Sequence, residues 1–346
     1  MSLKSKVLNV RARVNVVRRD IGKRFPIPIH KKLACWRKGF LAEKSTLYNF
    51  DRYGSKDFLS DYHADIARRI NAPFTDVLTN KYIFHEVAQG IIDNPQVFGL
   101  IISGTFHCRD ARKLLRPYRL TELLAEHQTL IMKPVTGGGG KGVWRVDKKE
   151  SIVSLNGEEI TTEQLESRVG ELNNYLVSEF VEQSDFSRSL NPSTTNTIRA
   201  VTLWDFKEKK PFVARAVQRV GVAKSAPFDN FTRGGLSCLI DESGRLSAGA
   251  SHPHTRVLQW HDVHPDSGCR FADQVIPNWP QIHDELLVAA GSFPFLPVIG
   301  WDLMLAKRGA VAIEGNHHPD PDVLQCHGPL LNDDRVKSFY SRFRIL

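Results

Sequence analysis

The sequence of 346 residues has few cysteines and no long apolar segment. Its five cysteines are scattered and form no Cys-x-x-Cys pair, which argues against a structural zinc site or a disulfide framework and fits a reducing compartment. No apolar run approaches the roughly 20 residues of a membrane-spanning helix. The N-terminus also lacks the apolar core of a secretory signal. We therefore expect a cytoplasmic protein.

Acidic residues are almost missing from the first 40 positions, which hold twelve lysines and arginines and a single acid, Asp20. The rest of the chain is close to neutral, because the net charge of the whole is +9. Apolar residues recur in this segment at three- and four-residue steps, which predicts a helix with one apolar face: Val7, Val10, Val14, Val17 and Ile21. Two interpretations stay open. The helix docks on its own domain with a solvated basic face, or residues 1–25 contact an anionic membrane surface or another acidic partner.

Four consecutive glycines are the most unusual feature that is present, in "LIMKPVTGGGGKGVWRV", residues 130–146. Strand patterns on both sides predict a hairpin whose tip is a flexible flap. Backbone amides without side chains suit phosphate oxygens, and Lys133 and Lys141 supply positive charge beside them. The loop is not a Walker A motif, because Val135 and Gly142 stand where that motif needs a glycine and a hydroxyl. A plain turn is the alternative.

A second hairpin is predicted in "WDLMLAKRGAVAIEGN", residues 301–316. Asp302 lies in its first strand, and Glu314 and Asn316 occupy alternate positions in its second, so their side chains project to one face. Carboxylate and amide oxygens are ligands that Mg²⁺ prefers. The alternative is a solvated hairpin with its polar residues outside, but an unpaired carboxylate in such apolar strands is unfavourable.

Arginines interrupt two predicted neighbouring strands in the middle of the chain. "NTIRAVTLW", residues 196–204, carries Arg199, and "PFVARAVQRVG", residues 211–221, carries Arg215 and Arg219. An arginine inside an apolar strand is either a salt-bridge partner or an anion-binding group, so the pattern alone leaves both roles open.

Taken in order, six segments resemble the ATP-grasp superfamily and, within it, the sugar-transfer-associated ATP-grasp family. They span residues 79–328 and read "NKYIFHEV", "IMKPVTGGGGKGV", "SEFVEQ", "NTIRAVT", "NFTRGG" and "GWDLML…AIEGNHHPDPDVLQ". The resemblance implies an α+β fold in which two α+β lobes grip ATP. It divides the chain into a basic helical N-terminal extension (1–75), an N-terminal lobe with the glycine-rich flap (76–178) and a C-terminal lobe with a metal site (179–346).

The resemblance also implies roles for single positions. The residues implied to bind ATP, from its phosphates to its adenine and ribose, are Lys81, Lys133, Gly137, Gly138, Gly139, Gly140, Lys141, Glu179, Val181 and Glu182. Those implied to bind Mg²⁺ are Asp302, Glu314 and Asn316. Those implied to act at the transferred phosphate are Arg199, Lys133 and Arg215. One position departs from the family pattern, because Asp320 follows Pro319 where a glycine is common, and this departure concerns the acceptor pocket.

The implied reaction is an ATP-dependent ligation. A carboxylate attacks the γ-phosphate of ATP to give an acyl phosphate, and an amine then displaces phosphate to form an amide. The implied partners are a small-molecule or sugar carboxylate and an amine, in the assembly of a polysaccharide or related metabolite, with no specific nucleic acid. Two alternatives stay open: a kinase of the same fold that phosphorylates a hydroxyl, and a non-catalytic adaptor that binds a membrane or nucleic acid through the basic N-terminus.

Overall fold

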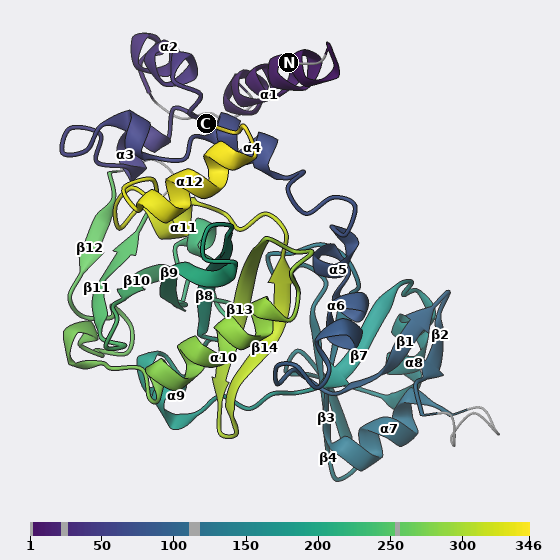
Figure 1. Cartoon of the computed structure of the whole chain (residues 1–346). Coiled ribbons are helices and arrows are strands. Elements are labelled where there is room, and N and C mark those ends of the chain that lie inside the picture. The colour runs from purple at the N-terminus through teal and green to yellow at the C-terminus, as the bar shows by residue number, and fades with distance from the viewer. Residues whose placement is uncertain (1–2, 22–26, 111–117, 253–256) are drawn as a thin grey trace. The chain divides into compact units, whose positions relative to one another are not determined.

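The computed structural model describes residues 3–21, 27–110, 118–252 and 257–346, with the side chains of residues 3–9 excepted. The chain forms two compact units. The first groups Met1–Thr75, Gln183–Ala310 and Asn316–Leu346, and the second groups Asp76–Glu182 and Val311–Gly315. Each unit combines helices with an antiparallel sheet, which confirms the α+β class (Figure 1). Residues of the predicted N-terminal extension fall within the first unit, and the division at residues 75 and 178 stays a prediction.

The second unit is built on a seven-stranded sheet with the order β2-β1-β7-β3-β4-β5-β6. Its strands are β1 (Val97–Ile102), β2 (Thr105–Cys108), β3 (Thr129–Pro134), β4 (Trp144–Lys149), β5 (Ile152–Leu155), β6 (Glu158–Ile160) and β7 (Tyr175–Glu179). Its helices are α5 (Asp76–Thr79), α6 (Lys81–Ala88), α7 (Leu120–His127) and α8 (Thr162–Gly170). The predicted glycine hairpin is confirmed, because β3 and β4 pair antiparallel on either side of the glycines.

The first unit contains the other seven-stranded sheet, with the order β12-β11-β10-β9-β8-β13-β14. Its strands are β8 (Thr197–Asp205), β9 (Lys210–Val220), β10 (Leu236–Ile240), β11 (Leu246–Ser251), β12 (Gln259–His261), β13 (Val298–Ala306) and β14 (Gly309–Asn316), the last of which gives residues 311–315 to the second unit. Its helices are α1 (Leu3–Ile21), α2 (Ile29–Arg37), α3 (Lys44–Leu47), α4 (Asp61–Ala67), α9 (Asp185–Leu190), α10 (Trp279–Gly291), α11 (Asp322–Gln325) and α12 (Asp334–Arg342). Both predicted strand pairs, β8 with β9 and β13 with β14, are confirmed.

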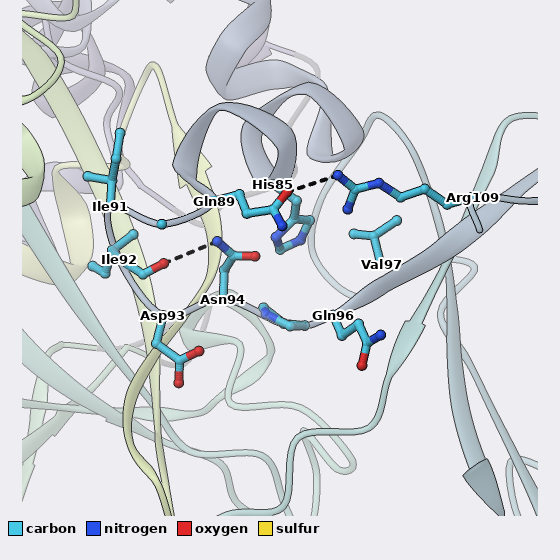
Figure 2. Close-up of a pocket in the computed structure, with 11 residues that line it drawn as sticks. His85, Gln89, Ile91, Ile92, Asp93, Asn94, Gln96, Val97 and Arg109 are labelled. Atoms are coloured by element: carbon cyan, nitrogen blue, oxygen red, sulfur yellow. Dashed lines mark hydrogen bonds between the residues drawn. The ribbon is translucent and has the colours of Figure 1, made fainter. Parts of the chain in front are cut away.

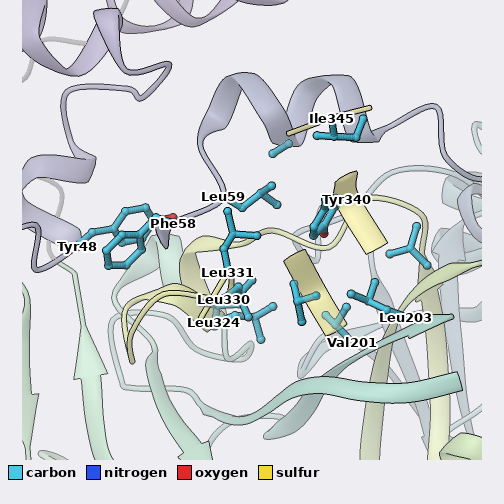
Figure 3. Packing of buried hydrophobic residues seen from close by; sticks show 14 of the residues in the cluster. Tyr48, Phe58, Leu59, Val201, Leu203, Leu324, Leu330, Leu331, Tyr340 and Ile345 are labelled. Carbon is cyan, nitrogen blue, oxygen red and sulfur yellow. The ribbon is translucent and has the colours of Figure 1, made fainter. Parts of the chain in front are cut away.

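The core of the first unit joins segments that are far apart in the sequence (Figure 3). The rings of Tyr48 and Phe58 stack with centroids 4.8 Å apart, and they belong to the same cluster as Leu203 of β8 and Leu331 and Tyr340 near the C-terminal end. Burial of a large apolar side chain stabilises the folded state by about 2 kcal/mol. Residues near position 50 are therefore part of the first unit's core.

A buried ionic cluster reinforces this packing. The ammonium group of Lys44 forms salt bridges with Asp322 and, at 3.6 Å, with Asp61. The hydroxyl of Tyr48 donates to Asp322 at 2.6 Å. Although burial opposes the charged form, Asp322 and Asp61 hold the pKa of Lys44 above its usual value. Breaking such a cluster would leave a buried charge without a partner, which is strongly unfavourable.

The predicted helix near the N-terminus is confirmed as α1, and it packs on its unit through a face other than the predicted apolar one. Among residues 10–21 of this helix, Ala12, Val16 and Asp20 are buried, whereas Val10 and Val14 are exposed. Asp20 turns inward because its carboxylate accepts hydrogen bonds from Trp36 Nε1 at 2.8 Å and from the backbone N–H of Ala42 at 3.1 Å. The side chain of Val7, and residues 1, 2 and 22–25 of the predicted membrane-contacting segment, lie outside the described residues. Among the helices that are described, none has the length and apolar character needed to cross a bilayer.

Candidate phosphate and metal site

Lys81 is fixed at the first position of α6. The side chain of Asn80 caps the helix by accepting a hydrogen bond from the backbone N–H of Ile83 at 3.1 Å, so the helix begins at Lys81. The ammonium group of Lys81 donates to the carbonyl of Gly137 at 2.6 Å and lies 3.4 Å from Glu314 Oε2. This lysine therefore connects the base of the glycine loop with a carboxylate of β14.

Lys133 is a buried cation on β3, with 5% of its surface exposed. Its Nζ donates to the carbonyl of Ile313 at 3.3 Å. Burial lowers the pKa of Lys133 to about 8; Glu314 opposes this fall, and Lys81 adds to it. Glu314 is thus the negative charge next to both lysines. Two cations that share one carboxylate leave a net positive charge, which an incoming anion such as a phosphate would neutralise.

The flap, residues 137–141, owes its backbone shape to glycine. Gly137, Gly139 and Gly140 have φ of 104°, 70° and 71°, in the left-handed region that side chains rarely adopt. Gly138 has no such φ, and a Cβ built on it would meet no atom within 4 Å. The fold of the described residues therefore gives no reason for glycine at position 138, and its predicted role in binding phosphate stays a prediction. Lys141 is exposed at the end of the flap.

The predicted adenine segment follows the end of β7. Glu179 pairs with Leu130 of β3, three register positions from the pair between Leu176 and Lys133. The backbone N–H of Glu179 donates to the carbonyl of Gln96 at 2.9 Å, so this amide already has a partner. Val181 is buried and Glu182 is exposed. That Glu179, Val181 and Glu182 bind adenine and ribose stays a prediction.

In the first unit, two arginines surround the predicted metal ligand Asp302. Arg199 of β8 lies directly opposite Asp302 of β13. Its Nε donates to Asp302 Oδ1 and its Nη2 donates to Oδ2 at 2.9 Å, while Arg219 Nη2 lies 3.2 Å from the same Oδ2. Arg199 and Asp302 are both buried. Both oxygens of Asp302 are thus engaged by guanidinium groups, and a cation would have to compete with them.

The three predicted Mg²⁺ ligands have the chemical groups that Mg²⁺ binds, but two of them form ion pairs with other side chains in this structure. Two carboxylates and an amide are oxygen donors of the hard kind that Mg²⁺ takes. Asn316 Nδ2 is buried and has no hydrogen-bond partner among the described residues, but Mg²⁺ would bind the amide oxygen, so this nitrogen gives no support to the metal site. Glu314 pairs with Lys81 and Asp302 with Arg199. The described part of the chain contains no group of three or more His, Cys, Asp and Glu side chains arranged to hold a metal.

Arg215, a predicted catalytic residue, holds backbone in this structure. Its guanidinium donates to the carbonyls of Leu324, Gly328 and Pro329 at 3.1, 2.5 and 3.4 Å. Burial lowers the pKa of Arg215. These bonds tie α11 and the segment after it to β9. The contacts give Arg215 a positioning function for this segment, and its predicted catalytic role stays a prediction.

Asp320, the position that departs from the family pattern, lies next to the buried ionic cluster of the first unit. Although the side chain of Asp320 is exposed, the protein atoms around it and the nearby Asp322 raise its pKa, against the opposing effect of Lys44. Its Oδ1 accepts a hydrogen bond from the backbone N–H of Asp322 at 3.0 Å. The carboxylate of Asp320 therefore stabilises the turn that leads into α11. Its pKa also lies above the usual value for an aspartate.

A cavity of about 560 Å³ beside α6 was not expected from the sequence (Figure 2). His85 and Arg109 line it with the segment between α6 and β1, and Arg109 donates to Gln89 Oε1 at 2.9 Å and to Glu86 Oε2 at 2.8 Å. Burial and the proximity of Lys133 lower the pKa of His85 to about 3, so the imidazole is neutral at pH 7. The sequence could not predict this cavity, because a single histidine within an apolar helix pattern does not indicate one.

Three solved structures resemble the chain distantly. D-cycloserine synthetase DcsG is 15% identical, with 79% of this chain and 73% of that chain covered and a TM-score of 0.41. D-alanine–D-alanine ligase from Bacillus anthracis, complexed with ATP, is 12% identical, with 78% and 67% covered and a TM-score of 0.39. N5-carboxyaminoimidazole ribonucleotide synthetase from Thermotoga maritima is 10% identical, with 73% and 45% covered and a TM-score of 0.38, so this chain spans less than half of that one. Likenesses this weak carry no argument about function.

No curated protein matches the chain. The model of a family described as sugar-transfer associated ATP-grasp matches residues 60–333, which is most of the sequence. The matched region contains both predicted hairpins, the two lysines and the arginine-bearing strands described above. The chain therefore belongs to the sugar-transfer associated ATP-grasp family.

Proposed function

We propose that the protein is an ATP-dependent carboxylate–amine ligase. An oxygen of the carboxylate attacks the γ-phosphorus of ATP and ADP leaves, which gives an acyl phosphate. The amine then attacks the acyl carbon, the bond to the phosphate oxygen breaks, and the amide forms with release of inorganic phosphate and a proton. The substrates we propose are a sugar uronate or another small carboxylate and an amino acid or other amine, in the cytoplasmic assembly of a polysaccharide or related metabolite.

The observation that carries this proposal is the grouping of Lys81, Lys133 and the flap around Glu314 in the second unit. Transfer of a phosphoryl group depends mainly on positioning and on neutralising the negative charge that spreads over the phosphate oxygens. Two lysines and a run of backbone amides are suited to that task, and no side-chain nucleophile is needed. Membership of an ATP-grasp family supports ATP as the phosphate source.

We propose that Asp302, Glu314 and Asn316 hold Mg²⁺ when ATP is bound. The metal would neutralise charge on the β- and γ-phosphates. In its absence, the arginine and lysine partners of the two carboxylates supply the compensating charge. We propose that Arg199, which is paired with Asp302, turns its guanidinium toward the transferred phosphate or the acceptor carboxylate, since both are anions that a planar fork of donors recognises.

A phosphate-release assay across a matrix of carboxylates and amines, with mass detection of products, tests the proposal. We expect ADP, phosphate and an amide only when both substrates are present. Lys133→Ala and Glu314→Ala should each abolish turnover in a folded protein. Lys149→Ala is the matched control, because Lys149 is an exposed lysine at the end of β4 in the same unit.

The outcome also separates the ligase from a kinase. A kinase would produce ADP and a stable phosphorylated acceptor, without free phosphate and without any need for an amine. Wild-type turnover in Lys133→Ala or Glu314→Ala would refute the assignment of the site itself. If no pair of substrates supports turnover but ATP binds and Lys133→Ala prevents binding, the nucleotide site stands and the reaction class fails.

A further inference from the structure

The first two helices expose apolar side chains that the first unit leaves uncovered. Val10, Val14 and Ile21 of α1 are 62%, 57% and 69% exposed, and Val17 is half-buried. Because an α-helix turns by about 100° per residue, these four side chains fall within an arc of about 60°. The arc lies away from the face that packs on the domain through Ala12, Val16 and Asp20. Single exposed apolar residues are ordinary, but an aligned stripe is a feature of interaction surfaces.

Arginines border this stripe on its solvent side. Arg11 and Arg18 are exposed, and the helix geometry places both next to the stripe on one flank. The other arginines of α1 are engaged within the unit. Arg19 Nη1 lies 3.1 Å from Asp65 Oδ1, and the guanidinium of Arg13 lies 4.8 Å from the ring centroid of Tyr62. Two of the described arginines therefore remain for an outside partner.

The second helix repeats the pattern. Ile29 and Leu33 of α2, one helical turn apart, are 63% and 45% exposed, and Lys31 and Arg37 are exposed on the same helix. The two helices belong to one structure, because Asp20 of α1 accepts the hydrogen bond of Trp36 Nε1 from α2. Asp20 is also the single acid of the first 40 residues, and it is fully buried. The charged side chains exposed on residues 10–21 of α1 and on α2 are therefore all basic.

We propose that α1 and α2 bind the surface of an anionic lipid bilayer, with the apolar stripes entering the headgroup region and the basic side chains contacting lipid phosphates. An interfacial helix combines these two features. A nucleic acid would be recognised by the arginines but not by the valines between them. A second copy of the chain is disfavoured, because its own segment of high positive charge would face this one. This inference does not depend on the proposed ligase reaction.

Flotation of the full chain with vesicles tests the proposal. We expect binding to vesicles of phosphatidylcholine mixed with phosphatidylglycerol, no binding to phosphatidylcholine alone, and weaker binding at high salt. Val14→Asp should lower the partition coefficient by about tenfold or more, because it places a charge in the stripe. The matched control is Val288→Asp, which changes a valine of α10 that is 68% exposed.

Two double variants that reverse charge separate binding by α1 from electrostatic attraction of the whole protein to anionic lipid. The double variant Arg11→Glu and Arg18→Glu should also bind about tenfold or more weakly. Lys207→Glu with Lys210→Glu is its control, because Lys207 in the turn after β8 and Lys210 at the start of β9 are both exposed. Circular dichroism checks that every variant is folded. The proposal is overturned if the wild-type chain does not float with anionic vesicles at low salt. It is equally overturned if Val14→Asp binds as the wild type does, since an effect of the arginines alone would indicate a nucleic acid or acidic protein.

Discussion

Replacing Lys133 by methionine should stabilise the protein while it abolishes ATP turnover. Methionine is unbranched and nearly as long as lysine, and it carries no charge. Burial lowers the pKa of Lys133 from 10.5 to about 8. A fall of this size means that holding the proton costs the folded state about 3 kcal/mol, at about 1.4 kcal/mol for each pH unit. The lost hydrogen bond to Ile313 offsets roughly 1 kcal/mol of this gain. We expect Lys133→Met to raise the free energy of unfolding by about 2 kcal/mol at pH 7.

The gain should depend on pH in a defined direction. Below pH 8 the lysine is protonated in both the folded and the unfolded wild-type chain, so the unfavourable burial is fully present. Between about pH 8 and 10.5 the folded chain releases the proton while the unfolded chain keeps it, and the stability of the wild type rises with pH. The variant lacks this titration. The difference in stability between the two proteins should therefore shrink across this window.

Urea denaturation near pH 7 and near about pH 9.5 measures this difference directly. Lys149→Met is the control, because Lys149 is exposed and should show no change at either pH. A variant that is less stable than the wild type at pH 7 would refute the reasoning, and so would a stability difference of the same size at both pH values. Either result would mean that Lys133 does not hold an unfavourable buried charge in the absence of ATP.

Three further predictions address the remaining parts of the site. Asp302→Asn should lower the free energy of unfolding by about 3 kcal/mol, measured by thermal denaturation, because it removes the carboxylate from a buried pair with Arg199; an unchanged melting temperature would contradict this. Arg215→Met should lower stability by about 2 kcal/mol through the loss of three carbonyl contacts, with the KM for ATP unchanged. A raised KM with normal stability would instead support its predicted catalytic role. Gly139→Ala should lose about 1 kcal/mol of stability because of its positive φ, whereas Gly138→Ala should lose none. Both should raise the KM for ATP, and a normal KM in Gly138→Ala would argue against phosphate binding by the flap.

Local patterns were sufficient to predict the hairpins of this fold. Glycines between two apolar strand patterns could only be accommodated as a loop, and β3 and β4 pair around them as expected. The face through which α1 packs was left open by the sequence, for an equally local reason. Residue hydrophobicity alone favours burial of the valines of α1 over burial of Ala12 and Asp20. Asp20 is buried because it accepts hydrogen bonds from Trp36 and from the backbone of Ala42. The periodicity of residues within α1 contains no information about these contacts with later segments.

The candidate site was predictable to a similar extent. The types of residue in the two hairpins indicated phosphate and metal chemistry, and the structure brings Lys81, Lys133 and Glu314 together. The pairing of Arg199 with Asp302 was not predicted, because it depends on the register between β8 and β13, two strands that are separated by about a hundred positions in the sequence. The roles of these five residues in binding ATP and metal remain predictions.

The central claim is that the protein transfers phosphate from ATP to a carboxylate on the way to an amide. The most direct measurement starts from a carboxylate identified in the substrate matrix and labelled with ¹⁸O at both of its oxygens. If an acyl phosphate forms and the amine displaces it, the released phosphate must carry one oxygen from the carboxylate. We predict that mass spectrometry finds this label in the inorganic phosphate of every completed turnover. Unlabelled phosphate, or label that remains entirely in the acceptor, would contradict the account.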